Sequence, residues 1–320
     1  MKAMKIGFHE SHEQYPPSEL LRLVALAERA GFSAAMCSDH FAPFSARQGH
    51  SGFAWSWLGA ALATTGLSFG TVSAPGYRYH PAVLAQGAAT LAEMFPGRFW
   101  LALGSGEYIN EQITGDAWPP LAARRERLRA CAGAIKALLR GETVSLDGPV
   151  RVRDAKLWSR PATPPLVVGA AVSPESAARV ASWADALVTV NQPEEVLRAV
   201  VRAFRENGGE GKPMYLQVHV AWAPDERAAL AAAYDQWRAN VFAGPVIWDA
   251  PTPEHLDAAA RFVREDDVRQ SVRVSSDLGQ HVAWIARDRE LGFDAVYLHE
   301  VGREQERFID TFATHVLGKI

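Results

Sequence analysis

The sequence alternates short apolar segments of strand type with longer segments whose apolar residues recur at helical spacing, and this alternation restricts the possible folds most strongly. Residues 4–9 form the first strand-type segment, and the helical spacing of Leu20, Leu23 and Ala27 follows until Gly31. Eight such repeats can be counted, the last being FDAVYLHEVG and EQERFIDTFATHVLGKI. Because right-handed connections place every helix outside, the pattern predicts an α/β fold, a (β/α)8 TIM barrel.

Two segments interrupt the alternation. Residues 143–165 are rich in Gly and Pro and indicate a hairpin or an irregular excursion, and residues 238–269 indicate a helical insertion. No linker separates independent parts, so we expect a single domain over residues 1–320. An open doubly wound sheet is the alternative, but no GxGxxG follows the first strand to open its helix.

Composition and charge narrow the kind of partner. The formal net charge is only −3, which gives no strong field toward nucleic acid or an anionic membrane, so a small-molecule substrate is expected. No run approaches the roughly 18 apolar residues of a membrane span, and the opening apolar patch is too short for a signal peptide, which predicts a cytoplasmic protein. Cys37 and Cys131 have no CxxC spacing and are expected to be buried thiols.

Polar residues stand where most of the predicted strands end. In a TIM barrel the carboxyl ends of the strands and the following loops build the active site, so most of these residues should gather on one face. They are His9, Glu10, Asp39, His40, Thr71, Ser73, Ser105, Glu107, His219, His299 and Glu300. A single His at a strand end is usually structural, and it is the set that predicts a site. Adjacent strand residues point in opposite directions, so Asp39 and His40 need not touch.

Two loops add further candidates. GSGEYINEQITG combines small residues that allow close backbone approach with the carboxylate of Glu107 and the amide of Asn110, although a solvated loop would have a similar composition. GAAVSPESAARVA opens a helix, and the free N–H groups of a helix start can bind an anion, although Ser-Pro caps also occur without ligands. Its residues at the helix start are Val172, Ser173, Glu175 and Ser176.

Together these segments resemble a known superfamily. The match is carried by SDHFAPF, GHSGFAWSWL, GTVSAPGYRYHPAVLAQ, ALGSGEYINEQITGDAWP, VVGAAVSPESAARVASWADALVT and GFDAVYLHEVGREQERFIDTF, in order and over nearly the whole chain. The chain resembles the bacterial luciferase-like flavin and deazaflavin oxidoreductases, especially the branch of the deazaflavin (F420)-dependent glucose-6-phosphate dehydrogenases. This resemblance implies a luciferase-like barrel that transfers hydride to or from a small organic substrate across a flavin-type ring.

The resemblance also implies roles for individual residues. His40 and Glu107 match a pair that takes part in proton transfer beside the ring, and His9 and Phe44 are expected in the substrate pocket. A non-proline cis peptide is implied at Thr71 and Val72. The implied cofactor contacts are Asp39, Thr71, Val72, Ala74, Ser105, Gly106, Asn110, Val172, Ser173, Glu175 and Ser176.

Two departures from this branch bear on substrate and cofactor. Phe44 stands where the sugar-phosphate enzymes carry Trp, and Asn191, Gln192 and Pro193 stand where they carry a phosphate-binding Lys. Without that charge-assisted partner, glucose 6-phosphate is predicted to be a poor substrate. The chain is also similar to luciferase-like proteins of organisms that do not make the deazaflavin. Both FMN and F420 therefore stay open as cofactors, and FMN is preferred.

Other functions are compatible with parts of the pattern. A flavin-dependent monooxygenase of the same family is one alternative. A metal-dependent barrel hydrolase could use His9, Asp39, His219 and His299, but the HxH pair common on the first strand of such barrels is missing, and no metal is expected. A non-catalytic flavin-binding protein would need no proton relay, which the presence of both His40 and Glu107 argues against. Relatives form dimers, so a homodimer is expected.

Overall fold

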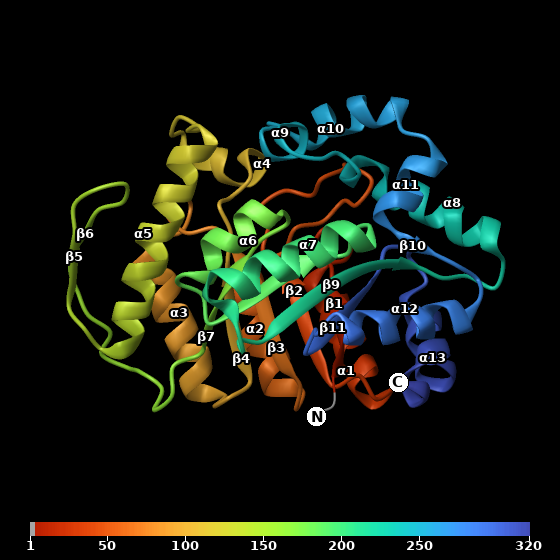
Figure 1. The fold of residues 1–320 in the computed structure, drawn as a ribbon, viewed down its shortest axis with the longest axis horizontal. Helices are drawn as coiled ribbons and strands as arrows, with labels where there is room; N and C mark the ends of the chain where they lie inside the picture. The colour runs from red at the N-terminus through yellow and green to blue at the C-terminus, as the bar shows by residue number, and fades with distance from the viewer. Residues whose placement is uncertain (1–3) are drawn as a thin grey trace.

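The computed structural model describes residues 4–320 and closes eight parallel strands into a barrel (Figure 1). Each strand pairs with the next along the chain, and the last pairs back with the first. The barrel strands are β1 (Lys5–Glu10), β2 (Ala34–Ser38), β3 (Ser68–Ser73), β4 (Phe99–Leu103), β7 (Leu166–Ala170), β8 (Ala186–Val190), β9 (Met214–Ala221) and β11 (Ala295–Glu300). The predicted (β/α)8 barrel is confirmed; residues 1–3 of the predicted domain lie outside the described residues.

Helices form the outer layer of the barrel. The eight that follow or precede its strands are α1 (Pro17–Arg29), α2 (Ala54–Thr64), α3 (Pro81–Met94), α5 (Leu121–Arg140), α6 (Pro174–Ala181), α7 (Glu194–Phe204), α12 (Leu278–Glu290) and α13 (Gln305–His315). The helical spacing of Leu20 and Leu23 places both on the buried face of α1, as the periodicity predicts. Among residues 4–320, none of the helices has the length and apolar character needed to cross a membrane.

The two interrupting segments lie outside the regular repeat. The hairpin of β5 (Val144–Leu146) and β6 (Val152–Ala155) projects beside α5, whereas the helical segments after α8 (Glu226–Trp237) lie above the barrel (Figure 1). The latter are α9 (Pro245–Trp248), α10 (Pro253–Ala259) and α11 (Glu265–Ser271), followed by the short strand β10 (Arg273–Val274). Short helical turns are α4 (Tyr108–Glu111), η1 (Gln112–Thr114), η2 (Arg205–Gly209), η3 (Arg238–Asn240), η4 (Ala260–Phe262) and η5 (Leu317–Lys319).

Alternate strand residues separate the interior of the barrel from the helix-covered outside. On β2, Ala34 and Met36 pack with the interior cluster, whereas Ala35 and Cys37 pack against the helices. The large rings of Trp100 and Tyr297 fill the centre of the barrel, and each requires glycine on the strand that faces it. A Cβ on Gly70 would lie 1.9 Å from Trp100 Cε2, so only glycine is compatible with this packing.

The cis peptide bond implied at Thr71 and Val72 is not found. Every peptide bond between residues 4 and 320 is trans. Strand β3 pairs in regular register with both neighbours at this point: Thr71 lies opposite Cys37 and Leu101. A regular ladder needs no bulge here, and the trans form is favoured by about 3 kcal/mol for a non-proline residue.

Candidate active site

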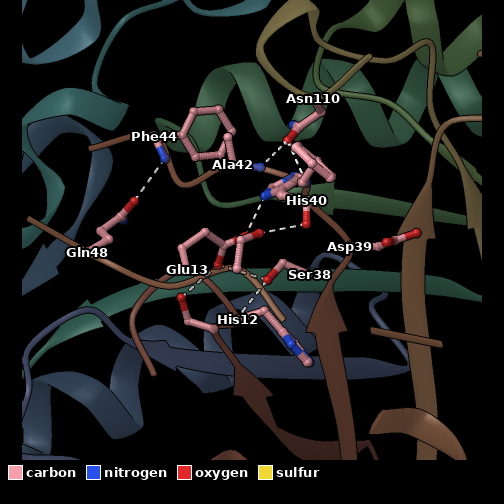
Figure 2. A network of polar contacts seen from close by, with 12 residues as sticks. His12, Glu13, Ser38, Asp39, His40, Ala42, Phe44, Gln48 and Asn110 are labelled. Atoms are coloured by element: carbon pink, nitrogen blue, oxygen red, sulfur yellow. Dashed lines mark hydrogen bonds and ion pairs between the residues drawn. The ribbon is translucent and has the colours of Figure 1, made fainter. Parts of the chain in front are cut away.

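The loop after β1 supplies a buried carboxylate that the sequence patterns did not single out. Figure 2 shows Glu13 between His40 and Ser38, with Oε1 of Glu13 in contact with Nδ1 of His40. Oε2 of Glu13 accepts hydrogen bonds from Ser38 Oγ and Ser11 Oγ, each at 2.8 Å. Because three partners fix this carboxylate, it holds the imidazole of His40 in a single orientation.

The second ring nitrogen of His40 faces Glu107 from the loop after β4. His40 Nε2 lies 3.6 Å from Glu107 Oε2, which also accepts a hydrogen bond from Asn110 Nδ2 at 3.0 Å. Asn110 Oδ1 in turn accepts from the backbone N–H groups of Phe41 at 2.8 Å and Ala42 at 3.2 Å. The amide of Asn110 therefore joins the loop after β4 to the loop that follows His40.

The charges of this group depend on one another. Burial lowers the pKa of His40, but the adjacent Glu13 carboxylate outweighs burial and raises that pKa to about 9. Burial acts to raise the pKa of Glu13, but the charge of His40 outweighs it and holds that pKa well below its usual range. Burial raises the pKa of Glu107, and His40 opposes this only in part. At neutral pH the site therefore holds an imidazolium between an ionised carboxylate and a carboxyl group of raised pKa.

Asp39 points away from His40 (Figure 2), as expected for adjacent strand residues. It takes part in a separate buried network. Its carboxylate is 2% exposed. The donors and cation around it are Ser73 Oγ, Trp55 Nε1 at 3.2 Å, Tyr79 OH at 2.9 Å and Arg78 Nη1 at 3.4 Å. These protein partners occupy both carboxylate oxygens of Asp39. Asp39 therefore stabilises the loop after β2 from the side opposite His40.

Small residues line the inner wall at the ends of β3, β4 and β7. Val72, Gly104 and Ala170 are each half-buried there. A Cβ added to Gly104 would lie 3.8 Å from Val72 Cγ1 and 4.0 Å from Ala170 Cβ, so glycine leaves a shallow recess between the two side chains. Small apolar side chains of this kind would allow one face of a flavin-type ring to approach the wall closely.

Residues just beyond the ends of β3 and β4 continue this wall. Gly106 has φ +82°, and a Cβ there would lie 3.3 Å from Ala74 Cβ, so glycine is required both for its backbone conformation and for close approach. Ser105 is half-buried beside it. Thr71, by contrast, lies on the outer face of β3; it is fully buried and donates a hydrogen bond to the carbonyl of Cys37 at 3.2 Å.

The start of α6 is capped by its own side chains. Ser173 Oγ accepts from Ser176 N at 3.2 Å, and Ser173 N donates to Ser176 Oγ at 3.0 Å. The Glu175 carboxylate pairs with Arg125 at 2.9 Å and with Arg179 at 3.1 Å, while Val172 is 40% exposed. The predicted anion site thus keeps few free N–H groups, and its nearest guanidinium groups are bound to Glu175.

Of the two expected substrate-pocket residues, Phe44 contacts His40 and His9 contacts another histidine. Phe44 is in edge contact with His40 at a ring-centroid distance of 5.0 Å. His9 lies on the inner face of β1 and stacks on His299 at 4.3 Å. Glu10 and Glu300 follow on the outer face, where Glu300 Oε2 accepts from Trp222 N at 3.0 Å, so these two strand-end carboxylates do not reach the mouth of the barrel.

The metal-ligand set considered for a hydrolase does not assemble. Within the described residues 4–320, no group of three His, Cys, Asp or Glu side chains is placed to hold a metal ion. His9 and His219 each contact His299, but Asp39 is directed into the network described above.

Comparison with known proteins shows the family of the chain. The sequence pattern of the luciferase-like monooxygenase family matches residues 4–295. The chain belongs to this family. Among family members, an F420-dependent glucose-6-phosphate dehydrogenase of Beutenbergia cavernae is 31% identical, with 99% of this chain and 97% of the relative covered.

Two further relatives carry dehydrogenase names. An F420-dependent hydroxymycolic acid dehydrogenase of Mycobacterium tuberculosis is 33% identical, covering 98% of this chain and 88% of the relative. The solved structure of an F420-dependent secondary alcohol dehydrogenase in complex with an F420-acetone adduct superposes with a TM-score of 0.92 at 26% identity and covers both chains completely. This luciferase-like family member is an oxidoreductase, as the sequence predicted.

The residue that the sequence patterns missed is the one that sets the charge of His40. Glu13 lies beyond the end of β1, in a short loop before Pro16 and Pro17, and strand periodicity does not reach it. The position of Glu107 could have drawn attention to Glu13, because Glu107 also lies just beyond the end of its strand. Loop carboxylates a few positions after each strand end deserve the same weight as the strand ends themselves.

Proposed function

We propose that the protein is an F420-dependent dehydrogenase that interconverts a secondary alcohol and the corresponding carbonyl compound. The observation that carries this proposal is the imidazole of His40, held between the carboxylates of Glu13 and Glu107 at the mouth of the barrel. A reaction that moves hydride from an alcohol carbon must also move the hydroxyl proton, and this group is built to exchange it.

Each residue of the site has its own part in the transfer of hydride and proton. When bound against the wall of Val72, Ala74 and Gly106, the deazaflavin would accept or return the hydride. In alcohol oxidation, His40 in its neutral form takes the hydroxyl proton, and Glu13 stabilises the resulting imidazolium. In carbonyl reduction, the imidazolium donates that proton to the substrate oxygen. Glu107 exchanges a proton on the other side of His40, where its raised pKa suits a group that is protonated in part of the cycle.

Names of relatives support F420 over FMN as the cofactor. The dehydrogenases that resemble this chain over nearly its full length are named as F420-dependent, and the earlier preference for FMN finds no support among them. The apolar wall accommodates either ring, so binding must distinguish the two. We expect F420 to bind at least about tenfold tighter than FMN, a difference of roughly 1.4 kcal/mol.

A direct experiment tests cofactor and reaction together. F420 and FMN are added separately to the purified protein, and binding is followed by the fluorescence of each cofactor. Reduction of F420 by a panel of secondary alcohols is then followed by loss of its visible absorbance. We expect tight F420 binding and alcohol-dependent reduction that falls at least about 100-fold in His40→Ala. Tighter binding of FMN, or full activity of His40→Ala, would contradict the proposal.

We propose further that glucose 6-phosphate is not the physiological substrate. Asn191 stands near the place of the phosphate-binding Lys, and its amide is used within the protein: Oδ1 accepts from His219 N at 2.8 Å and Nδ2 donates to Ser271 O at 3.0 Å. A dianionic phosphate loses a charge-assisted partner there. Steady-state kinetics should give a kcat/KM for glucose 6-phosphate at least about 100-fold below that for the best neutral alcohol, and efficient turnover of the phosphate would contradict this.

The assembly and location of the protein belong to the same proposal. We propose a homodimer that uses the outer faces of α2 and α3, because α2 contains no charged residue and Val83 and Met94 of α3 are 57% and 55% exposed. We also propose a cytoplasmic location. It is supported by the two buried thiols Cys37 and Cys131, neither of which forms a disulfide among residues 4–320.

A further inference from the structure

Three histidines form a continuous row on the inner wall of the barrel, across the mouth from the predicted cofactor wall. His299 lies directly opposite His219 in the register of β11 and β9, and the register of β1 and β11 places His9 beside His299. We propose that this row, together with Gln217, recognises the hydroxyl groups of the substrate, which is an uncharged, polyhydroxylated secondary alcohol. This inference rests on the dehydrogenase function proposed above.

The position of the row follows from the closed order of strands. Around the barrel, β11 is four strands away from β4 in both directions, β1 is four from β7, and β9 is four from β3. The row on β1, β11 and β9 therefore lies diametrically opposite the wall formed by β3, β4 and β7. A substrate held between that wall and His40 turns its non-reacting end toward the histidines.

Ring contacts fix the row in place. His9 stacks on His299 at 4.3 Å, and His219 meets His299 edge-on at 5.5 Å. Trp237 lies against both His219 at 4.6 Å and His299 at 4.8 Å, and Gln14 Oε1 is 3.0 Å from His299 Nε2. Side chains fixed in this way can present hydrogen-bonding atoms without a large loss of conformational entropy on binding.

Gln217 and His219 are the more exposed members of this group, and the His219 ring also has a hydrogen-bond partner in the backbone of Ser271. Both residues are half-buried on the inner face of β9, and their Nε2 atoms are 3.2 Å apart. Whichever tautomer His219 adopts, this pair combines donor and acceptor capacity, which matches a hydroxyl group. Nδ1 of His9 and Nδ1 of His299 have no hydrogen-bond partner within residues 4–320, so the row is not satisfied by the protein itself.

The row offers hydrogen bonds without positive charge. Burial lowers the pKa of His9 to about 4 and that of His219 to about 3, so both rings are neutral at physiological pH. A phosphate or carboxylate facing this wall would find no cation on it, whereas hydroxyl groups need none. A purely aliphatic alcohol would leave these polar groups unpaired on binding, which weakens its binding relative to a polyol.

A matched pair of substrates tests the inference. Cyclohexanol and cyclohexane-1,4-diol share a secondary alcohol and differ in one distal hydroxyl. We expect kcat/KM for the diol to exceed that for cyclohexanol at least about tenfold, mainly through KM. His219→Leu should abolish this preference, and His219→Gln should restore part of it. His315→Leu, a change at an exposed position on α13, is the control. Equal kcat/KM values in the wild type, or an unchanged preference in His219→Leu, would overturn the inference.

A binding measurement keeps this test separate from that of the dehydrogenase function. Histidine ring resonances of isotope-labelled protein are recorded during titration with cyclohexane-1,4-diol, and His219→Leu identifies the resonance of interest. A shift of the His219 resonance supports recognition of the diol even if F420 is not reduced, and no shift overturns it. Failure of F420 to bind, measured by its own fluorescence, counts against the proposed function alone.

Discussion

His40 carries its proton at neutral pH because Glu13 is ionised beside it, and this makes Glu13 the residue that sets the pH dependence of the reaction. In the wild type, kcat/KM for alcohol oxidation should rise with pH up to about 9, where His40 loses its proton. In Glu13→Gln the carboxylate is gone, so the pKa of His40 falls and the rise moves to lower pH. A pH profile of each enzyme checks this, and superimposable profiles would refute it.

The same ion pair links stability to pH. The pKa of folded His40, about 9, lies above its unfolded value of about 6.5, so the stabilisation is complete below about 6.5 and is lost as pH rises through about 9. The pKa of Glu13 is lowered, so its contribution is present above about 4.5 and is lost in acid. Melting temperatures between pH 6 and pH 10 should therefore fall less in Glu13→Gln than in the wild type, apart from effects common to both proteins.

Asn110 acts on the same proton group by positioning it. Asn110→Asp keeps an acceptor for the N–H groups of Phe41 and Ala42 but places a second carboxylate beside Glu107. Like charges raise the pKa of Glu107 further, so any acid limb of the pH profile that depends on Glu107 moves to higher pH. Asn110→Ala should lower kcat/KM about tenfold through loss of geometry, without that movement of the limb. An identical limb in Asn110→Asp and Asn110→Ala would contradict the assignment.

At the scale of elements, the helical insertion holds the loop that follows β2. Asp257 of α10 accepts hydrogen bonds from Ser45 Oγ at 2.6 Å and Ala46 N at 3.0 Å, close to Phe44 and the ring of His40. We predict that Asp257→Ala destabilises the protein by about 1–3 kcal/mol in chemical unfolding and raises KM for the alcohol. Glu254→Ala, in an exposed position on the same helix, is the matched control. Equal effects of the two changes would show that α10 does not position this loop.

The elements that the sequence predicted are those with a clear local period. Buried parallel strands such as FWLAL and amphipathic helices such as α7 can be predicted from the pattern of their own residues. The two-residue strand β10 does not, because it exists only where it pairs with Val220 and Ala221 of β9. Glu13 was missed for a related reason: its role depends on a partner on another strand, which local patterning does not reveal.

Closure of the whole barrel explains which site residues could be predicted. Strand ends placed His40 and Glu107 in one larger polar set, because parallel strands bring their carboxyl ends to one rim. The resemblance to the luciferase-like family implied that these two act as a pair, and the structure places the two side chains together. The same rule does not say which side of the wall each residue faces, and so Glu10 and Glu300 were grouped with the site although they point outward. Whether a polar residue is available to a ligand depends on its tertiary partners, as Asp39 and its donors illustrate.

The last prediction concerns the assembly of the whole molecule. Trp55 of α2 packs on Gly87 of α3, so the two helices present one continuous outer surface, on which Ala60 is exposed. Burying this surface, whose α2 part carries no charged residue, against a second copy would remove apolar area from water, whereas a buried arginine without a partner would strongly oppose association. Ala60→Arg should therefore convert a dimer to a monomer in light scattering coupled to size-exclusion chromatography, while Thr314→Arg on α13 stays dimeric. A dimer that survives Ala60→Arg, or a wild type that is monomeric, would exclude this face as the interface.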